Sequence, residues 1–294
     1  MRELTVLESQ HDSSVNFVWR HRVGSVEARY VRRREDRAII YLSSKSGCAM
    51  RCKMCHLTQS GQSQAINLTL DETLHQAETV LRYLQEAVEG GAIAPIVGVD
   101  YSFMARGDFF DNALFIAEAP ELLRRLHVLA ARYGFDARVK ISTIMPQALR
   151  SLSLSAIFGS WTPDLYYSVY SVEDGFRDEW LPRAMTVPQA LRILTDWQVE
   201  SRKIIILHGA FISGENDDPA ALAVLGDMVR GYGLRVDWNV VRYNPFSDDH
   251  GCETEDLSRC VRALKQAFPE SQVNVISRVG PDVLASCGMF VRSE

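Results

Sequence analysis

The chain of 294 residues is 47% hydrophobic and carries a formal net charge of −5, a composition typical of a globular protein large enough to bury a full core. No apolar run approaches the roughly 18 residues of a membrane span, and the N-terminal segment lacks a signal-peptide pattern, so we expect a cytoplasmic protein. The net charge also excludes a wholly basic nucleic-acid binder. Arginines nevertheless crowd residues 20–37, as a face that tracks phosphates or as a solvated hairpin face.

The predicted elements alternate along the chain. Residues 15–31 alternate in polarity around a turn at Gly24 and predict a β-hairpin. Strands are then expected at 38–42, 96–103, 137–143, 165–170, 203–207, 236–241 and 273–277. Helical patterns lie between them, from a capping box at Thr69 and Glu72 to Gly90, and at 120–133, 147–158, 187–199, 219–232 and 255–268.

This alternation predicts parallel strands with crossover helices, in a barrel or an open sheet whose chemistry gathers at the carboxyl ends of the strands. We expect an N-terminal hairpin extension over residues 1–37 and an α/β core over residues 38–294.

Three of the six cysteines, Cys48, Cys52 and Cys55, follow the first core strand with the spacing C-x3-C-x2-C. Three thiolates so spaced hold three irons of a [4Fe-4S] cluster and leave the fourth iron without a protein ligand. Zinc is the main rival, but a structural zinc site takes four closed ligands, and His56, adjacent to Cys55, would reach the same ion only with strain. A third reading is that these are ordinary buried cysteines.

The spacing resembles the radical S-adenosylmethionine superfamily, in which the open iron chelates S-adenosylmethionine and an electron cleaves it to a 5′-deoxyadenosyl radical. The resemblance implies a partial (β/α)6 TIM-like barrel, a [4Fe-4S] cluster and S-adenosyl-L-methionine as cofactors, and an external electron donor such as flavodoxin or ferredoxin. The superfamily usually has an aromatic residue before the last cysteine. Met54 stands there, and its thioether is also able to pack against an adenine.

Further signatures resemble the RlmN and Cfr group of that superfamily, which methylates an adenine of ribosomal RNA, RlmN also acting on some transfer RNAs. Residues 42–48 and the pair Val26-Glu27 are similar to the group's stretches at and before its cluster loop. The resemblance implies that several residues at strand ends contact S-adenosylmethionine, with Asp108 replacing the group's glutamate. They are Gly107, Asp108, Ser142 with Thr143, Ser168 and Asn244.

The segment 278–288 is similar to the one that carries the group's methyl-accepting cysteine, which would be Cys287. In the mechanism so implied, one S-adenosylmethionine methylates the cysteine by displacement, and the radical from a second removes hydrogen from the new methyl group. The carbon radical then adds to the base. The thiolate this requires would be helped by a neighbouring positive charge.

One departure concerns the group's second cysteine, which resolves the protein–nucleic acid adduct and lies seven residues before the first cluster cysteine. Tyr41 stands there. We hypothesise that Cys252, in the loop after Asn244, substitutes for it, whereas Cys260 falls in a helical pattern and is expected to be core. The alternative is that Tyr41 itself donates a hydrogen atom or merely fills space.

The group's N-terminal RNA-binding domain is also expected to be absent, because about 40 residues precede the core. Recognition would then rest on the arginine-rich hairpin, the mouth of the barrel or a partner.

The sequence therefore predicts a radical enzyme that modifies a nucleic-acid base or nucleotide, with methyl transfer through Cys287 as its leading chemistry and no membrane partner. A second reading keeps the radical without methylation, leading to rearrangement, cross-linking or oxidation of a nucleotide, peptide or metabolite. A third is a zinc-stapled nucleic-acid-binding module.

Overall fold

The structure is a computed structural model that describes residues 1–292. Over these residues the strands form a ten-stranded sheet in which spatial order follows chain order. The strands are β1 (Arg2–Glu8), β2 (Val15–Arg20), β3 (Ser25–Arg32), β4 (Arg37–Tyr41), β5 (Gly98–Phe103), β6 (Asp136–Thr143), β7 (Asp164–Ser168), β8 (Ile205–Gly209), β9 (Val236–Val241) and β10 (Val273–Ile276).

The sheet has an antiparallel part and a parallel part. Strands β1 to β4 pair antiparallel, and β4 to β10 pair parallel, as crossover helices require. The predicted parallel α/β class is therefore confirmed. Strands β2 and β3 occupy the expected hairpin, while β1 was not predicted. The division at residue 37 stays a prediction, because β3 and β4 pair across it within one sheet.

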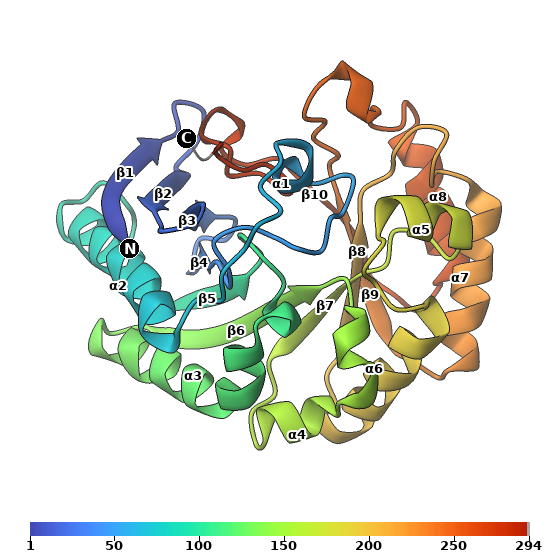
Figure 1. Ribbon diagram of the computed structural model, residues 1–294, viewed down its shortest axis with the longest axis horizontal. Coiled ribbons are helices and arrows are strands. Elements are labelled where there is room, and N and C mark those ends of the chain that lie inside the picture. The colour runs from blue at the N-terminus through green and yellow to red at the C-terminus, as the bar shows by residue number, and fades with distance from the viewer. Residues whose placement is uncertain (293–294) are drawn as a thin grey trace.

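The helices are α1 (His56–Gln59), α2 (Leu70–Glu89), α3 (Ala113–Arg132), α4 (Leu154–Phe158), α5 (Asp174–Trp180), α6 (Val187–Ser201), α7 (Pro219–Gly231) and α8 (Leu257–Ala267), with short 3-10 turns η1 (Phe109–Asp111), η2 (Gln147–Ser151), η3 (Asp248–His250) and η4 (Pro281–Val283). Helices α2, α3, α4, α6, α7 and α8 lie along the outer side of the curved sheet, whereas α1 belongs to the loop that follows β4, as Figure 1 shows. The capping box predicted at Thr69 and Glu72 is present at the start of α2. No helix over the described residues is long and apolar enough to cross a membrane.

Two helical predictions differ from the structure. Helix α3 begins seven residues before Pro120, because Asn112 caps its first turn and the chain tolerates the proline after a kink at Glu118. The pattern at 147–158 divides into η2 and α4, because Leu152 is extended and Ser153 starts the second helix as its cap.

The two faces of the parallel strands have different surroundings. Alternate side chains such as Ile40, Tyr101 and Ile141 are fully buried in the core under the helices. Their neighbours, including Ile39 and Asp100, point to the inside of the curved sheet and line a cavity. The sheet thus separates an apolar layer from an interior that is available for a ligand.

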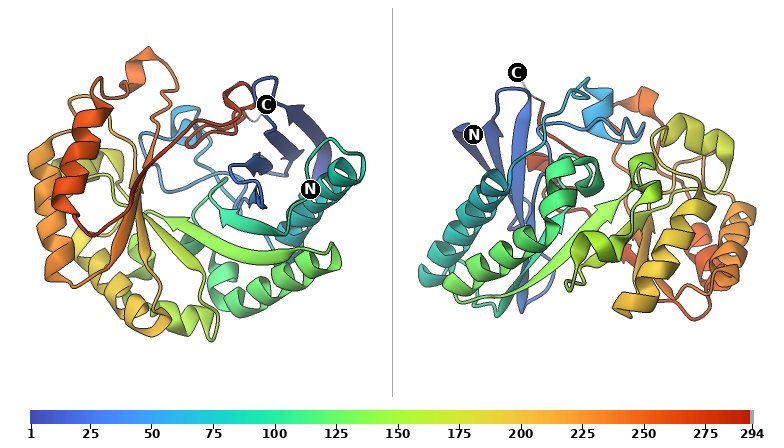
Figure 2. Two further views of the ribbon diagram at one scale, coloured as in Figure 1. Left: turned by 180° about the vertical axis from the view of Figure 1, so that it is seen from behind. Right: turned by 60° about the horizontal axis from the view of Figure 1, so that its bottom comes forward.

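The C-terminal segment, residues 277–292, closes the open side of the sheet. It leaves β10 and crosses to the antiparallel strands, where Asn16 of β2 donates to the carbonyl of Val283 and Arg29 of β3 donates to that of Met289 (Figures 1 and 2). Ser9 Oγ donates to Asp282 at 2.7 Å, and the amide of Gly280 donates to Asp12 at 2.8 Å. These bonds join the loop between β1 and β2 to the segment that follows β10.

Candidate active site

The cysteine loop leaves the carboxyl end of β4, the first parallel strand, and is held by backbone bonds. The amide of Cys48 donates to the carbonyl of Gln62 at 3.2 Å, and the amide of Lys53 donates to that of Trp180 at 2.9 Å. Gly47 packs so closely that a Cβ there would lie 2.3 Å from the carbonyl oxygen of Gln64. The loop's shape thus depends on contacts with the following segment and with α5.

The three thiols of this loop lie in surroundings that disfavour isolated charges. Cys48, Cys52 and Cys55 are half-buried, and burial raises the pKa of each, that of Cys55 to about 11, while repulsion among the thiolates adds to the shift at Cys48 and Cys52. Three adjacent thiols of this kind ionise readily only where a cationic metal compensates them.

The donor set fits a [4Fe-4S] cluster better than a Cys3His zinc ion. His56 Nε2 lies 3.0 Å from the carbonyl oxygen of Asn244 and its ring packs on Phe246, so this imidazole is already engaged. Over residues 1–292 no group of three or more His, Cys, Asp or Glu side chains is already converged as a ligand set, so the fit rests on the donors and their surroundings.

Cys287 is brought to the cysteine loop by the C-terminal segment. The amide of His56 donates to the carbonyl of Gly288 at 2.9 Å, and Asn244 Nδ2 donates to the carbonyl of Cys287 at 2.9 Å. The Cys287 thiol is accessible from the cavity. Desolvation by the surrounding protein raises the pKa of this thiol, while the charges of Arg29 and Arg33 act in the opposite direction.

A buried ion network holds the C-terminal segment in this position. Glu27 pairs with Arg29 at 2.7 Å and with Arg106 at 2.7 Å, and all three side chains are at most 3% exposed. Burial by itself raises the pKa of Glu27, but Arg106 and Arg29 hold it below its ordinary value. Arg29 donates to the carbonyl of Met289 at 2.6 Å, and the amide of Val291 donates to Glu27 at 3.0 Å.

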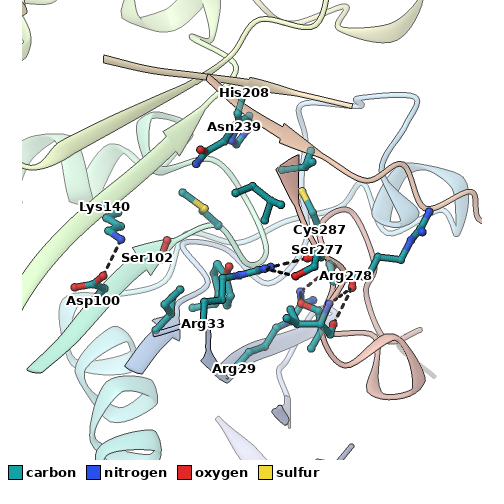
Figure 3. A pocket seen from close by; sticks show the side chains of 18 of the residues that line it. Arg29, Arg33, Asp100, Ser102, Lys140, His208, Asn239, Ser277, Arg278 and Cys287 are labelled. Carbon is teal, nitrogen blue, oxygen red and sulfur yellow. Dashed lines mark hydrogen bonds and ion pairs between the residues drawn. The ribbon is translucent and has the colours of Figure 1, made fainter. Parts of the chain in front are cut away.

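A cavity of about 230 Å³ lies inside the curved sheet, shown in Figure 3. Tyr41, Asn244 and Cys287 all line it, so three of the predicted site residues share one chamber. Cys252 does not line it and is exposed, and Cys260 is buried in α8. Met54 is buried in an apolar cluster with Met50 and Trp180.

Ser142 and Ser168 meet at the carboxyl ends of β6 and β7, together with a histidine that was not predicted. His208 Nε2 lies 2.6 Å from Ser168 Oγ and 3.3 Å from Ser142 Oγ. Burial lowers the pKa of His208 to about 4, so the ring is neutral at physiological pH. The register of β7 and β8, which pairs Ser168 with His208, brings the ring here, and no local sequence signal could have shown it.

Asp108 is turned into the protein. Its carboxylate accepts bonds from the amides of Phe110 and Ile144, both at 3.0 Å, and from Thr143 Oγ1 at 3.2 Å. Burial raises its pKa to about 6. The backbone of Gly107, at φ +88°, lies close to Ser44, and only glycine fits there because a Cβ would lie 2.6 Å from Ser44 Oγ.

The amide of Asn244 connects the two segments that carry site residues. Its Oδ1 accepts from Arg278 Nε at 2.7 Å, while its Nδ2 binds the Cys287 carbonyl. Asn244, which follows β9, is thus bonded directly to the backbone of Cys287. Tyr41 lines the same cavity, whereas Asp108 and Cys252 do not.

Comparison with known proteins gives the same picture. No family model matches the chain. Among curated relatives, the probable dual-specificity RNA methyltransferase RlmN of Corynebacterium glutamicum is 24% identical over 302 residues, covering 100% of this chain and 78% of the relative. The protein of the same name from Frankia alni is 30% identical over 284 residues, covering 92% of this chain and 63% of the relative.

Solved structures show the same fold. A radical SAM methyltransferase from Sphaerobacter thermophilus superposes with a TM-score of 0.79 at 20% identity, covering 98% of this chain and 81% of the other. Methylornithine synthase (PylB) superposes with a TM-score of 0.51 at 10% identity, covering 82% and 64%.

A curved parallel sheet with a three-cysteine loop after its first parallel strand, together with these relatives, defines a radical S-adenosylmethionine enzyme. Within that class the chain is similar to the RlmN and Cfr group. The superfamily's cofactors, S-adenosylmethionine and an iron–sulfur cluster, are accordingly those that the chain is expected to use.

Proposed function

We propose that this protein methylates an RNA base by way of a methylated Cys287. Cys48, Cys52 and Cys55 would hold a [4Fe-4S] cluster, which when bound supplies the electron that cleaves S-adenosylmethionine to a 5′-deoxyadenosyl radical. An external donor such as flavodoxin or ferredoxin would reduce it. The names of the curated relatives support RNA as the substrate.

The observation that carries the proposal is the bonding of two cysteine segments that lie more than 200 residues apart. The cysteine loop and the C-terminal segment are joined through His56 and Gly288, and Asn244 is bonded to the backbone of Cys287. A solitary cysteine in a C-terminal loop needs no such anchoring. The arrangement places a thiol that opens to the cavity next to the loop expected to hold the cluster.

The chain's own residues have separate tasks in this scheme. Cys287 would accept a methyl group by displacement at the sulfonium of S-adenosylmethionine, releasing S-adenosylhomocysteine. Arg29 and Arg33 favour the thiolate that this step needs. S-adenosylmethionine would accept or donate hydrogen bonds at a cluster formed by Ser142, Ser168 and the neutral His208. Gly107 and Asp108 would shape the neighbouring strand end.

One observation favours a second function, a radical reaction without methylation. Tyr41 lines the cavity at the position where the RlmN and Cfr group has its resolving cysteine, and no cysteine among the described residues other than Cys287 lines that cavity. Under this alternative Tyr41 would donate a hydrogen atom to a substrate radical.

The deciding experiment is an anaerobic reaction of the reconstituted protein with S-adenosylmethionine and a reductant. The protein is then digested with a protease, and the mass of the peptide that carries Cys287 is measured by mass spectrometry. We expect a mass increase of one methyl or methylene group on Cys287 and none on the peptide that carries Cys252, which serves as the internal control.

The Cys287→Ser variant should form 5′-deoxyadenosine but no methylated RNA. An unmodified Cys287 together with 5′-deoxyadenosine would reject methyl transfer through this residue and favour the reaction with Tyr41. A colourless protein that holds zinc would reject both radical functions.

A further inference from the structure

The cavity that contains Cys287 has a strongly cationic lining. Its side chains include seven arginine or lysine residues and a single carboxylate, that of Asp100. The seven are Arg29, Arg33, Arg34, Arg37, Lys140, Arg242 and Arg278. A cation of this lining attracts an anion only where no carboxylate of the protein already neutralises it.

Six of these seven cations have a carboxylate partner. Arg37 and Lys140 share Asp100, Arg37 also reaches Asp136, and Arg242 and Arg278 share Glu253. The remaining pairs are Arg29 with Glu27 and Arg34 with Asp36. These pairs neutralise most of the lining.

Arg33 is the exception among the seven over the described residues. Its bonds are to neutral acceptors, from Nη1 to the carbonyl oxygen of Ser277 at 2.9 Å and to Ser277 Oγ at 3.3 Å. A guanidinium has five N–H donors in a planar fork, and this pair of bonds uses one nitrogen. Figure 3 shows the Arg33 side chain extending across the cavity towards Ser277, below Cys287.

Besides neutral polar groups, the lining has an apolar and aromatic part. Ile39, Met104, Tyr166 and Val241 face the cavity, together with Tyr41. Flat aromatic and apolar side chains are surfaces on which a nucleic-acid base stacks. The volume of about 230 Å³ lies below the roughly 300–1,000 Å³ of sites for drug-sized ligands, so a single extruded base is a better fit than a helical stretch of nucleic acid.

We propose that Arg33 binds the backbone phosphate next to the target base, and that the base itself lies against Tyr41 and Tyr166. The part of the cavity between Arg33 and Tyr41 therefore takes a flipped nucleotide of a single-stranded RNA segment, recognised by one charge-assisted contact at its phosphate, and His208 remains on the side proposed for S-adenosylmethionine. This inference rests on the proposed function and specifies the substrate of the same site.

The competing explanation is that Arg33 only fastens the two ends of the sheet together. It lies in the turn between β3 and β4, and Ser277 directly follows β10. A fastening arginine would influence stability, but it would not distinguish a charged from a neutral linkage in a ligand.

The test compares two probes on the anaerobic, reconstituted protein with S-adenosylmethionine. One is a single-stranded RNA trinucleotide of adenosines with ordinary phosphodiester linkages, and the other has neutral methylphosphonate linkages. We expect the native protein to bind the charged probe at least about tenfold more tightly. In Arg33→Gln this preference should fall to about twofold or less, and in Arg33→Lys it should be intermediate, because the charge remains without the fork.

Arg22→Gln is the matched control. Arg22 belongs to the same N-terminal run of arginines, is exposed and does not line the cavity, so its removal changes net charge by the same amount. It should keep the native preference.

A preference that is equal in native and Arg33→Gln proteins, or no binding of either probe, would overturn the proposal. The mass of the Cys287 peptide separates this failure from failure of the function. If Cys287 becomes methylated in Arg33→Gln and native proteins alike while the preference is unchanged, methyl transfer stands and the phosphate contact does not.

Discussion

The cysteine loop and the C-terminal segment both bring cysteines to one site, but they are held by different means. The loop is held partly by the segment that follows it, through the bond from Cys48 to Gln62, and partly by α5, through the bond from Lys53 to Trp180. The C-terminal segment is held by residues more than 170 positions away, through the buried pairs of Glu27 with Arg29 and Arg106. The three cysteines of the loop can be recognised from their spacing in the sequence. The position of Cys287, in contrast, depends on ion pairs between residues far apart in the chain.

The largest effect is expected in the loop, from Cys52→Ala. Removing one of three thiolates should abolish the cluster and with it all formation of 5′-deoxyadenosine, because the remaining cysteines supply too few ligands. Iron content and charge-transfer absorption of the anaerobic protein measure this. Cys260→Ala is the control, since that thiol is buried in α8 away from the loop. A brown, active Cys52→Ala protein would contradict the ligand assignment.

The second effect is expected at the anchor of the C-terminal segment, from Glu27→Gln. The variant leaves Arg29 and Arg106 buried without a carboxylate, which should lower the free energy of unfolding by about 3–5 kcal/mol. Methylation of Cys287 should fall at least tenfold while the cluster is retained. Denaturant unfolding and the mass of the Cys287 peptide measure the two effects.

Glu121→Gln is the control for this change, because its pair with Arg124 is exposed and should contribute little. If Glu27→Gln does not fold, Asn16→Ala is the milder variant. Asn16 Nδ2 donates to the carbonyl of Val283 at 3.0 Å, so its loss loosens the segment but retains both ion pairs. Unchanged methylation in both variants would show that the anchor does not position Cys287.

A third, smaller effect concerns the strand ends between the two segments and depends on pH. His208 has a pKa of about 4 in the folded protein, below its ordinary value, because burial disfavours the charged ring. The unfolded chain therefore binds more protons between pH 6.5 and 4, and the contribution of His208 to stability is present above pH 6.5 and lost as the pH falls through 4.

His208→Gln keeps a hydrogen-bonding group beside Ser168 and removes this titration. Relative to the native protein, the variant should lose less stability between pH 6.5 and 4, by at most about 3 kcal/mol. Asp108, whose raised pKa of about 6 acts in the opposite sense, is the same in both proteins and cancels in the difference. Parallel stability curves would show that the ring is not buried as a neutral base.

The smallest effect is expected from Cys252→Ser. Cys252 is exposed and outside the cavity that contains Cys287, so the yield of methylated RNA per enzyme should change by less than about twofold. Multiple-turnover assays measure this. A loss of tenfold or more would instead identify Cys252 as the thiol that resolves the adduct, as the sequence hypothesis holds.

The sequence by itself determined the parallel α/β class, because alternating strand and helix patterns are local, and it determined the cysteine loop, because all three thiols lie within eight residues. It also gave most strand positions to within a few residues. It missed β1 and the start of α3, where an asparagine cap rather than a proline begins the helix.

Only the tertiary structure decided which distant side chains meet. The pairing of β7 with β8 brings His208 to Ser168, and the return of the C-terminal segment over β1 to β3 puts Cys287 beside the cysteine loop. Among the N-terminal arginines, it separated Arg29, which is buried and paired, from Arg33, which faces the cavity without a carboxylate. The physical reason is that burial and charge pairing depend on strand register and chain return, which no local pattern of residues encodes.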